Sequence, residues 1–73
     1  SLESNRRDVG KTFRVLVEGP SKRNPAELCG RNSQNKMCVW PDTVHRAGDF
    51  VDVTVKECTQ ATLLCELFRI FVE

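Results

Sequence analysis

The chain is almost without histidine, the side chain that enzymes use most often to move protons. His45 is its only imidazole, and it lies beside Arg46 in a turn-like segment with no convincing nucleophile nearby. A catalytic triad needs an imidazole within hydrogen-bond reach of a nucleophile and of a carboxylate. We therefore interpret His45 as a surface residue and expect no catalytic residues in this chain.

Closely spaced cysteine pairs are also missing. The four cysteines are separated by eight, nineteen and six residues, at Cys29, Cys38, Cys58 and Cys65. Structural zinc sites usually take two ligands from one tight loop, with about two to four residues between them. The spacing therefore argues against a metal site. Two disulfides remain an alternative, but we favour four reduced thiols that act as small packing residues in a cytosolic protein.

Long apolar runs are absent as well. No segment approaches the roughly 18–20 apolar residues that span a bilayer. The N-terminus lacks the charged-then-apolar order of a secretory signal, so we expect a cytoplasmic protein that makes no membrane contact. A length of 73 residues allows one small domain, and 40% hydrophobic with 29% charged residues is ordinary for a globular fold.

The charges are unevenly distributed, although they nearly balance overall. Residues 6–46 hold nine basic and four acidic side chains, whereas residues 47–73 hold two basic and five acidic ones. A basic half joined to an acidic end is typical of proteins that bind polyanions. For any single lysine or arginine, a solvated surface position is the more ordinary interpretation.

Apolar segments predict five strands. Alternation with a period of two places Val51, Val53 and Val55 on an inner face, with Asp52 and Thr54 on the outer face. The expected strands lie at residues 12–18, 28–32, 37–41, 50–55 and 63–72.

These strands define the expected domain organisation. Residues 1–9 are polar without a periodic apolar face, and we interpret them as a linker from a preceding domain or a frayed helix. Residues 10–73 then form the domain. Five short strands without a long helical period predict an all-β fold, a small five-stranded antiparallel barrel that is OB-like, which means of the oligonucleotide-binding type.

The second and third expected strands should form a hairpin. A turn centred on residues 34–35 would place Arg31 opposite Cys38 and Cys29 opposite Trp40, all on one face. Gly30 would then point inward, which suggests a crowded barrel interior.

The candidate binding residues are cations, together with one aromatic side chain. Lysine and arginine contact phosphates, and a planar aromatic ring can stack on an unpaired base. Trp40 suits stacking, but a core position with its indole N–H hydrogen-bonded is an equal alternative. The candidates for RNA binding are Lys11, Arg14, Lys22, Arg23, Arg31, Lys36, Trp40 and Arg46.

Several segments together resemble a known domain family. Phe-Arg-Val-Leu-Val-Glu-Gly-Pro-Ser-Lys at residues 13–22 is followed by Leu-Cys-Gly-Arg-Asn at residues 28–32, by Asn35 and by Val-Trp-Pro at residues 39–41. This series resembles the TRAM domain, in particular the TRAM domain at the C-terminal end of tRNA methylthiotransferases. The resemblance covers about residues 10–66.

The resemblance implies an RNA-binding accessory domain of a tRNA-modifying enzyme. Ser21 and Asn35 join the candidate RNA contacts on this ground, and Lys22 and Arg31 are the family-like positions best suited to touch RNA. The implied partners are the anticodon stem-loop of tRNA and a radical-SAM catalytic domain of the same polypeptide. The 4Fe-4S clusters and S-adenosylmethionine of such an enzyme have no matching motif here, so no cofactor is expected in this chain itself.

A protein-docking module is the alternative interpretation. An apolar C-terminal surface would then pack on the catalytic domain without direct RNA contact. One continuous basic face would favour RNA binding, whereas scattered cations and an exposed apolar patch would favour docking. The residues of this expected docking surface are Leu67, Phe68, Ile70, Phe71 and Val72.

Overall fold

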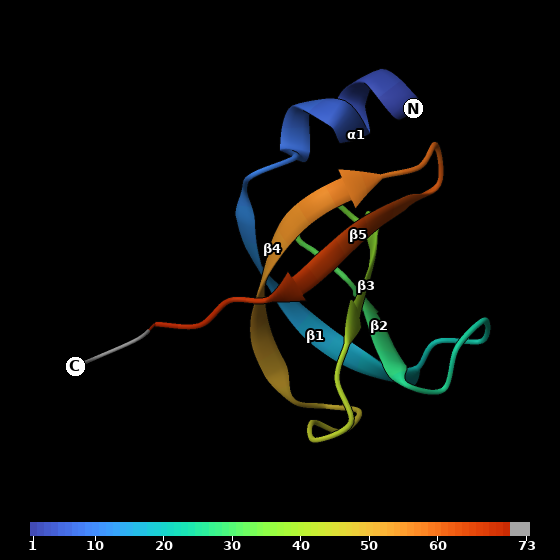
Figure 1. Ribbon diagram of the computed structural model, residues 1–73, viewed down its shortest axis with the longest axis vertical. Coiled ribbons are helices and arrows are strands. Elements are labelled where there is room, and N and C mark those ends of the chain that lie inside the picture. Colours follow the sequence, from blue (N-terminus) through green and yellow to red (C-terminus); the bar gives the residue numbers. More distant parts are fainter. Residues whose placement is uncertain (71–73) are drawn as a thin grey trace.

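Five strands close into a barrel, and a short helix lies against one end of it (Figure 1). This computed structural model describes residues 1–70. Its elements are α1 (Leu2–Asp8), β1 (Thr12–Pro20), β2 (Glu27–Arg31), β3 (Met37–Pro41), β4 (Phe50–Cys58) and β5 (Thr62–Leu67). The predicted all-β, OB-like barrel is therefore confirmed. The last strand ends at Leu67, so its expected continuation through residues 68–70 is wrong, while Phe71 and Val72 lie outside the described residues.

The barrel is mixed rather than purely antiparallel. The strands follow one another around it in the order β1-β2-β3-β5-β4, and β4 pairs back onto β1. All neighbouring pairs are antiparallel except β3 and β5, which run parallel. An odd number of strands cannot alternate in direction all the way round a closed ring. One parallel pair is therefore a necessary consequence of closing five strands.

The inner face follows the predicted alternation. Val51, Val53 and Val55 are buried, while Asp52 is exposed on the outer face. These valines pack with branched and sulfur-containing side chains from the other strands, and a buried core of this kind supplies most of the stability of a small domain. The remaining buried members of the core cluster are Val15, Val17, Leu28, Cys38, Trp40, Leu63 and Cys65.

Gly30 of β2 is buried where β1 and β2 approach each other closely. The sequence predicted a crowded interior at this position. A Cβ atom added to Gly30 would stand 2.1 Å from the carbonyl oxygen of Leu16 in β1. Real Cβ atoms do not come so near to a backbone oxygen. Glycine at this position therefore permits the β1–β2 pairing.

The predicted register of the β2–β3 hairpin is wrong by one residue. Arg31 pairs with Met37, and Gly30 pairs with Cys38. The connection is longer than a two-residue turn, because Asn35 adopts a left-handed φ of 60° and the Asn32 amide donates to the Lys36 carbonyl at 3.1 Å. A shift of one residue moves each side chain to the opposite face of the sheet.

Helix α1 is anchored to the barrel, where the sequence predicts a linker or a frayed helix. The side-chain amide of Asn5 donates from Nδ2 to the backbone carbonyls of Thr59 and Gln60 in the β4–β5 turn, at 2.8 and 3.1 Å. Asp8 is buried and pairs with Lys36 of the β2–β3 turn. The helix thus joins two turns at one end of the barrel. Within residues 1–70, no helix is long and apolar enough to cross a membrane.

Candidate nucleic-acid interface

The outer face of β1 carries a row of exposed side chains between two neighbouring strands. Because Val15 and Val17 point into the core, Arg14 and Leu16 point outward. Leu16 is paired with Phe50 of β4 on one side and with Arg31 of β2 on the other. Leu16 is 45% exposed and Phe50 is 60% exposed. We call Arg14, Leu16, Arg31 and Phe50 the β1 platform.

Both arginines of the β1 platform are positioned by local contacts. The guanidinium carbon of Arg14 lies 5.2 Å from the centroid of the Phe50 ring, a cation–π geometry. Arg31 donates from Nη1 to the backbone carbonyl of Asn35 at 3.1 Å, which holds its side chain beside the hairpin turn. Two cations therefore flank an exposed apolar pair. An aromatic ring with neighbouring guanidinium groups can stack on an unpaired base while the cations contact its phosphates.

Phe50 is not among the candidate residues predicted from the sequence, although the strand pattern carries the signal for it. An alternation that sends Val51 inward necessarily sends Phe50 outward. A large exposed aromatic side chain on a strand is a stronger indication of a binding surface than a buried one.

Trp40 lies in the core, which decides between its two predicted roles. Its side chain is 0% exposed, and its Nε1 donates to Oδ2 of Asp42 at 3.1 Å. Trp40 pairs with the buried Leu28, whereas Arg31 lies on the outer face. The prediction that Trp40 and Arg31 share one face is therefore wrong, and the expected stacking by Trp40 is replaced by the core position.

Lys11 and Lys36 both contact the buried carboxylate of Asp8. Lys36 Nζ lies 2.6 Å from Asp8 Oδ2 and 2.8 Å from Ser4 Oγ, while Lys11 Nζ lies 3.1 Å from Asp8 Oδ1. The hydrogen bond from Lys36 lowers the pKa of Asp8 by more than burial raises it. These two lysines are thus engaged in holding α1 against the barrel.

Lys22 and Arg23 lie at the other end of β2, in the loop between β1 and β2. Arg23 Nε is 3.4 Å from Glu27 Oε1, and both cations are exposed. Ser21 is buried, and its amide donates to the Glu27 carbonyl at 2.8 Å, so Ser21 shapes the loop. Lys22 and Arg23 line a shallow groove with Cys29 of β2.

Arg46 belongs to the β3–β4 loop, at the end of the barrel opposite α1 (Figure 1). Its amide donates to Asp49 Oδ2 at 2.9 Å, and its side chain is exposed. The structure therefore does not gather the predicted cations into one basic face. It separates them into the β1 platform, the Asp8 contacts, the β1–β2 loop and Arg46.

The cysteines do not fit an iron–sulfur cluster. All four are free thiols, with Cys38 and Cys65 buried and Cys29 and Cys58 half-buried. Among the residues that the structure describes, no three His, Cys, Asp or Glu side chains are grouped so that they could hold a metal ion. Burial raises the pKa of the Cys29 thiol, an effect opposite to the one that prepares a thiolate ligand.

These features define an OB-like β-barrel domain whose outer face combines cations with exposed apolar side chains. The TRAM domain family matches residues 6–68, and the chain belongs to this family. The resemblance expected from the sequence is thereby confirmed.

The chain is also similar in sequence to part of several named proteins. The chain is 49% identical over 67 residues to the tRNA-2-methylthio-N(6)-dimethylallyladenosine synthase of Amoebophilus asiaticus. It is 57% identical over 63 residues to the enzyme of the same name from Phocaeicola vulgatus, and 48% identical over 67 residues to that from Porphyromonas gingivalis. These matches cover 92%, 86% and 92% of the chain but only 14% of each relative. The chain therefore corresponds to a small part of these proteins.

Proposed function

We propose that the chain is the RNA-binding accessory domain of a tRNA-modifying methylthiotransferase, and that it holds the anticodon arm of tRNA for a radical-SAM catalytic domain of the same polypeptide. The observation that carries this proposal is the exposed Leu16–Phe50 pair with Arg14 and Arg31 beside it. The names of the relatives supply the substrate class. Because tRNA is the substrate, the proposal places the domain in the cytoplasm.

The β1 platform would bind the RNA through two kinds of contact. An unpaired base would stack on Phe50 and Leu16, since stacking tolerates any base. Arg14 and Arg31 would contact the flanking phosphates, and such contacts fix position rather than sequence. Lys22, which is exposed in the β1–β2 loop, would extend the phosphate contacts.

The domain itself would lengthen the time that tRNA stays bound, and the catalytic domain would carry out the reaction. The 4Fe-4S clusters and S-adenosylmethionine would belong to the catalytic domain, because the cysteines described above do not fit a cluster. Holding the anticodon arm would raise the local concentration of tRNA at that domain, as linked binding sites generally do.

The test is a titration of the chain with an anticodon stem-loop RNA, followed by amide chemical shifts in NMR spectra. We expect the largest shifts at Arg14, Leu16, Arg31 and Phe50, and small shifts in α1. With about three neutralised phosphates, the log–log slope of affinity against salt should be about −2. Shifts confined to other surfaces, or a flat salt dependence, would contradict the proposal.

Protein docking is a second candidate, favoured by the separation of the cations into several groups and by the exposed apolar segment after β5. Phe68 is 46% exposed and Ile70 is 75% exposed, whereas Leu67 is half-buried. Phe71 and Val72, the other members of the expected docking surface, lie outside the described residues. Docking predicts that Ile70→Ser leaves RNA affinity unchanged and weakens association with the catalytic domain in a pull-down of the separate domains.

A further inference from the structure

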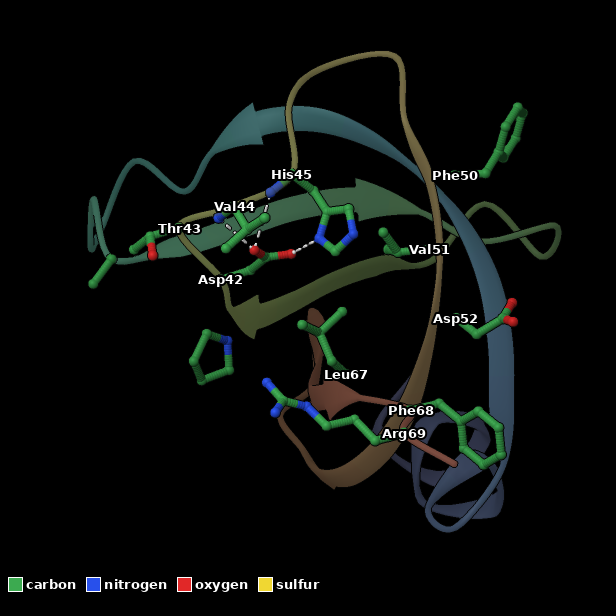
Figure 2. A pocket seen from close by; sticks show the side chains of 12 residues that line it. Asp42, Thr43, Val44, His45, Phe50, Val51, Asp52, Leu67, Phe68 and Arg69 are labelled. Carbon is green, nitrogen blue, oxygen red and sulfur yellow. Dashed lines mark hydrogen bonds and ion pairs between the residues drawn. The ribbon is translucent and has the colours of Figure 1, made fainter. Parts of the chain in front are cut away.

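A groove of about 630 Å³ lies between the β3–β4 loop and the segment that follows β5 (Figure 2). Its walls include His45 from the loop, Phe68 and Arg69 from the segment, and Phe50 from the start of β4. Its volume is within the roughly 300–1,000 Å³ of sites that hold small organic groups. Because Phe50 also belongs to the β1 platform, the groove is continuous with the proposed RNA surface.

Asp42 is a buried residue of this groove that is held in place by several hydrogen bonds. Its carboxylate accepts hydrogen bonds from Trp40 Nε1 at 3.1 Å, from the amides of Val44 and His45 at 2.8 and 3.2 Å, and makes a 2.6 Å contact with His45 Nδ1. Burial alone would raise the pKa of Asp42, but these hydrogen bonds lower it to about 2. The carboxylate is therefore ionised throughout the physiological range.

An ionised carboxylate can only accept hydrogen bonds, so it orients the His45 ring. Nδ1 must carry a proton and point toward Asp42, and Figure 2 shows the ring held in this way at the edge of the groove. The other nitrogen, Nε2, is then available on a side chain that is 37% exposed. When the ring is neutral, Nε2 is an acceptor; when the ring is protonated, Nε2 becomes a charged donor.

Charged groups surround His45 on each side. Arg69 lines the groove from the C-terminal segment, and Asp52 lines it from β4. Arg46 and Glu18 line the adjoining hollow on the other side of the β3–β4 loop. Asp52 and Glu18 are thus the carboxylates in these two linings, and the two arginines provide further cations for an anionic group.

We propose that this groove receives the nucleotide next to the one stacked on the β1 platform, and that protonated His45 and Arg69 contact its phosphate. The inference rests on the proposed function, because it requires RNA on the platform. Only the protonated ring can donate from Nε2 to a phosphate oxygen. RNA binding is therefore coupled to the uptake of up to one proton from solvent by each chain.

The test compares the affinity for the anticodon stem-loop RNA at pH 6 and pH 8. The unmodified chain should bind about threefold to tenfold more tightly at pH 6, as expected for one charge-assisted contact near the surface. Its salt slope should be steeper at pH 6 by about 0.7, the contribution of one phosphate on a single strand. His45→Asn keeps a donor for Asp42 but has no outer nitrogen, so its affinity should be the same at both pH values.

A second measurement needs no variant. The carbon and nitrogen shifts of the His45 ring report its protonation, and RNA should keep the ring protonated to a higher pH. Titration in two buffers of different ionisation enthalpy should show the same proton uptake calorimetrically. Agreement of these results supports the inference even if His45→Asn is too unstable to use.

The outcomes separate this inference from the proposed function. Tight RNA binding that is equal at both pH values, with an unchanged ring titration, overturns the inference and leaves the proposed function standing. Absence of RNA binding at low salt overturns both.

Discussion

Leu16 of β1 and Phe50 of β4 are direct cross-strand partners on the outside of the barrel, and both remain exposed. A cross-strand apolar pair normally contributes to a buried face, whereas this one faces solvent. Arg14 covers part of the Phe50 ring, and Arg31 lies on the other side of Leu16. Exposed apolar side chains that adjoin one another often mark a binding surface.

Removing the ring of Phe50 should weaken RNA binding with little effect on folding. Stacking of a base on an aromatic side chain contributes about 1–3 kcal/mol, so Phe50→Ala should raise the dissociation constant about fivefold to more than 100-fold. Fluorescence anisotropy with a labelled anticodon stem-loop measures this change. Val9→Ala is the matched control, because Val9 is 44% exposed and lies beside α1. Equal losses in both variants would argue against the β1 platform.

Reversing the charge of Arg31 should weaken binding to any tRNA and reduce its salt dependence. Arg31→Glu removes one phosphate contact, so the log–log salt slope should become shallower by about 0.7 or more. Lys22→Glu should act in the same direction from the β1–β2 loop. Affinity measured at several salt concentrations gives the slope. An unchanged affinity for both variants would remove the assigned role of these cations.

Lys36 should stabilise the folded state through its contact with Asp8. Lys36→Ala removes the closer partner of the buried Asp8 carboxylate, and the free energy of unfolding should fall by about 1–3 kcal/mol. The matched control is Lys11→Ala, because Lys11 is the more exposed partner of the same carboxylate and should cost less. Urea unfolding measures both. Amide exchange of α1 should also become faster in Lys36→Ala, and an unchanged helix would contradict this role.

Asp42 should make the fold sensitive to acid. Hydrogen bonds outweigh burial and lower its pKa from 3.8 to about 2. Because the folded state has the lower pKa, the stabilisation is complete well above pH 4 and is lost as the pH falls toward 2. The shift corresponds to about 2 kcal/mol. Urea unfolding at a series of pH values measures this contribution.

Two variants identify Asp42 as the source of that acid sensitivity. Asp42→Asn should be less stable at neutral pH, and its stability should fall less steeply between pH 4 and pH 2. Some acid dependence should remain, because the pKa of Asp8 is also lowered. Asp49→Asn, in the exposed part of the same loop, should follow the unmodified chain. A steep dependence that survives in Asp42→Asn would place its origin elsewhere.

Much of the barrel could be predicted from local pattern. Alternating valines identify strands and decide which side chains face inward, because successive side chains in a strand point to opposite faces. The segments that resemble the TRAM domain also predict the family, and the match over residues 6–68 confirms it. The same alternation is sufficient to place Phe50 on the outer face, whereas the aromatic residue predicted from the sequence to bind RNA, Trp40, lies in the core.

The sequence by itself thus determined the strands, their inner faces and the family. The tertiary structure alone decided the parallel β3–β5 pair, the hairpin register that buries Trp40, and the contact of Lys36 with an aspartate 28 residues away. The physical reason is the range of each interaction. Strand periodicity is a property of neighbouring residues, whereas register, ring closure and ion pairing depend on where distant segments meet. For the same reason, the predicted basic half of the chain became several separate groups of cations once the barrel closed.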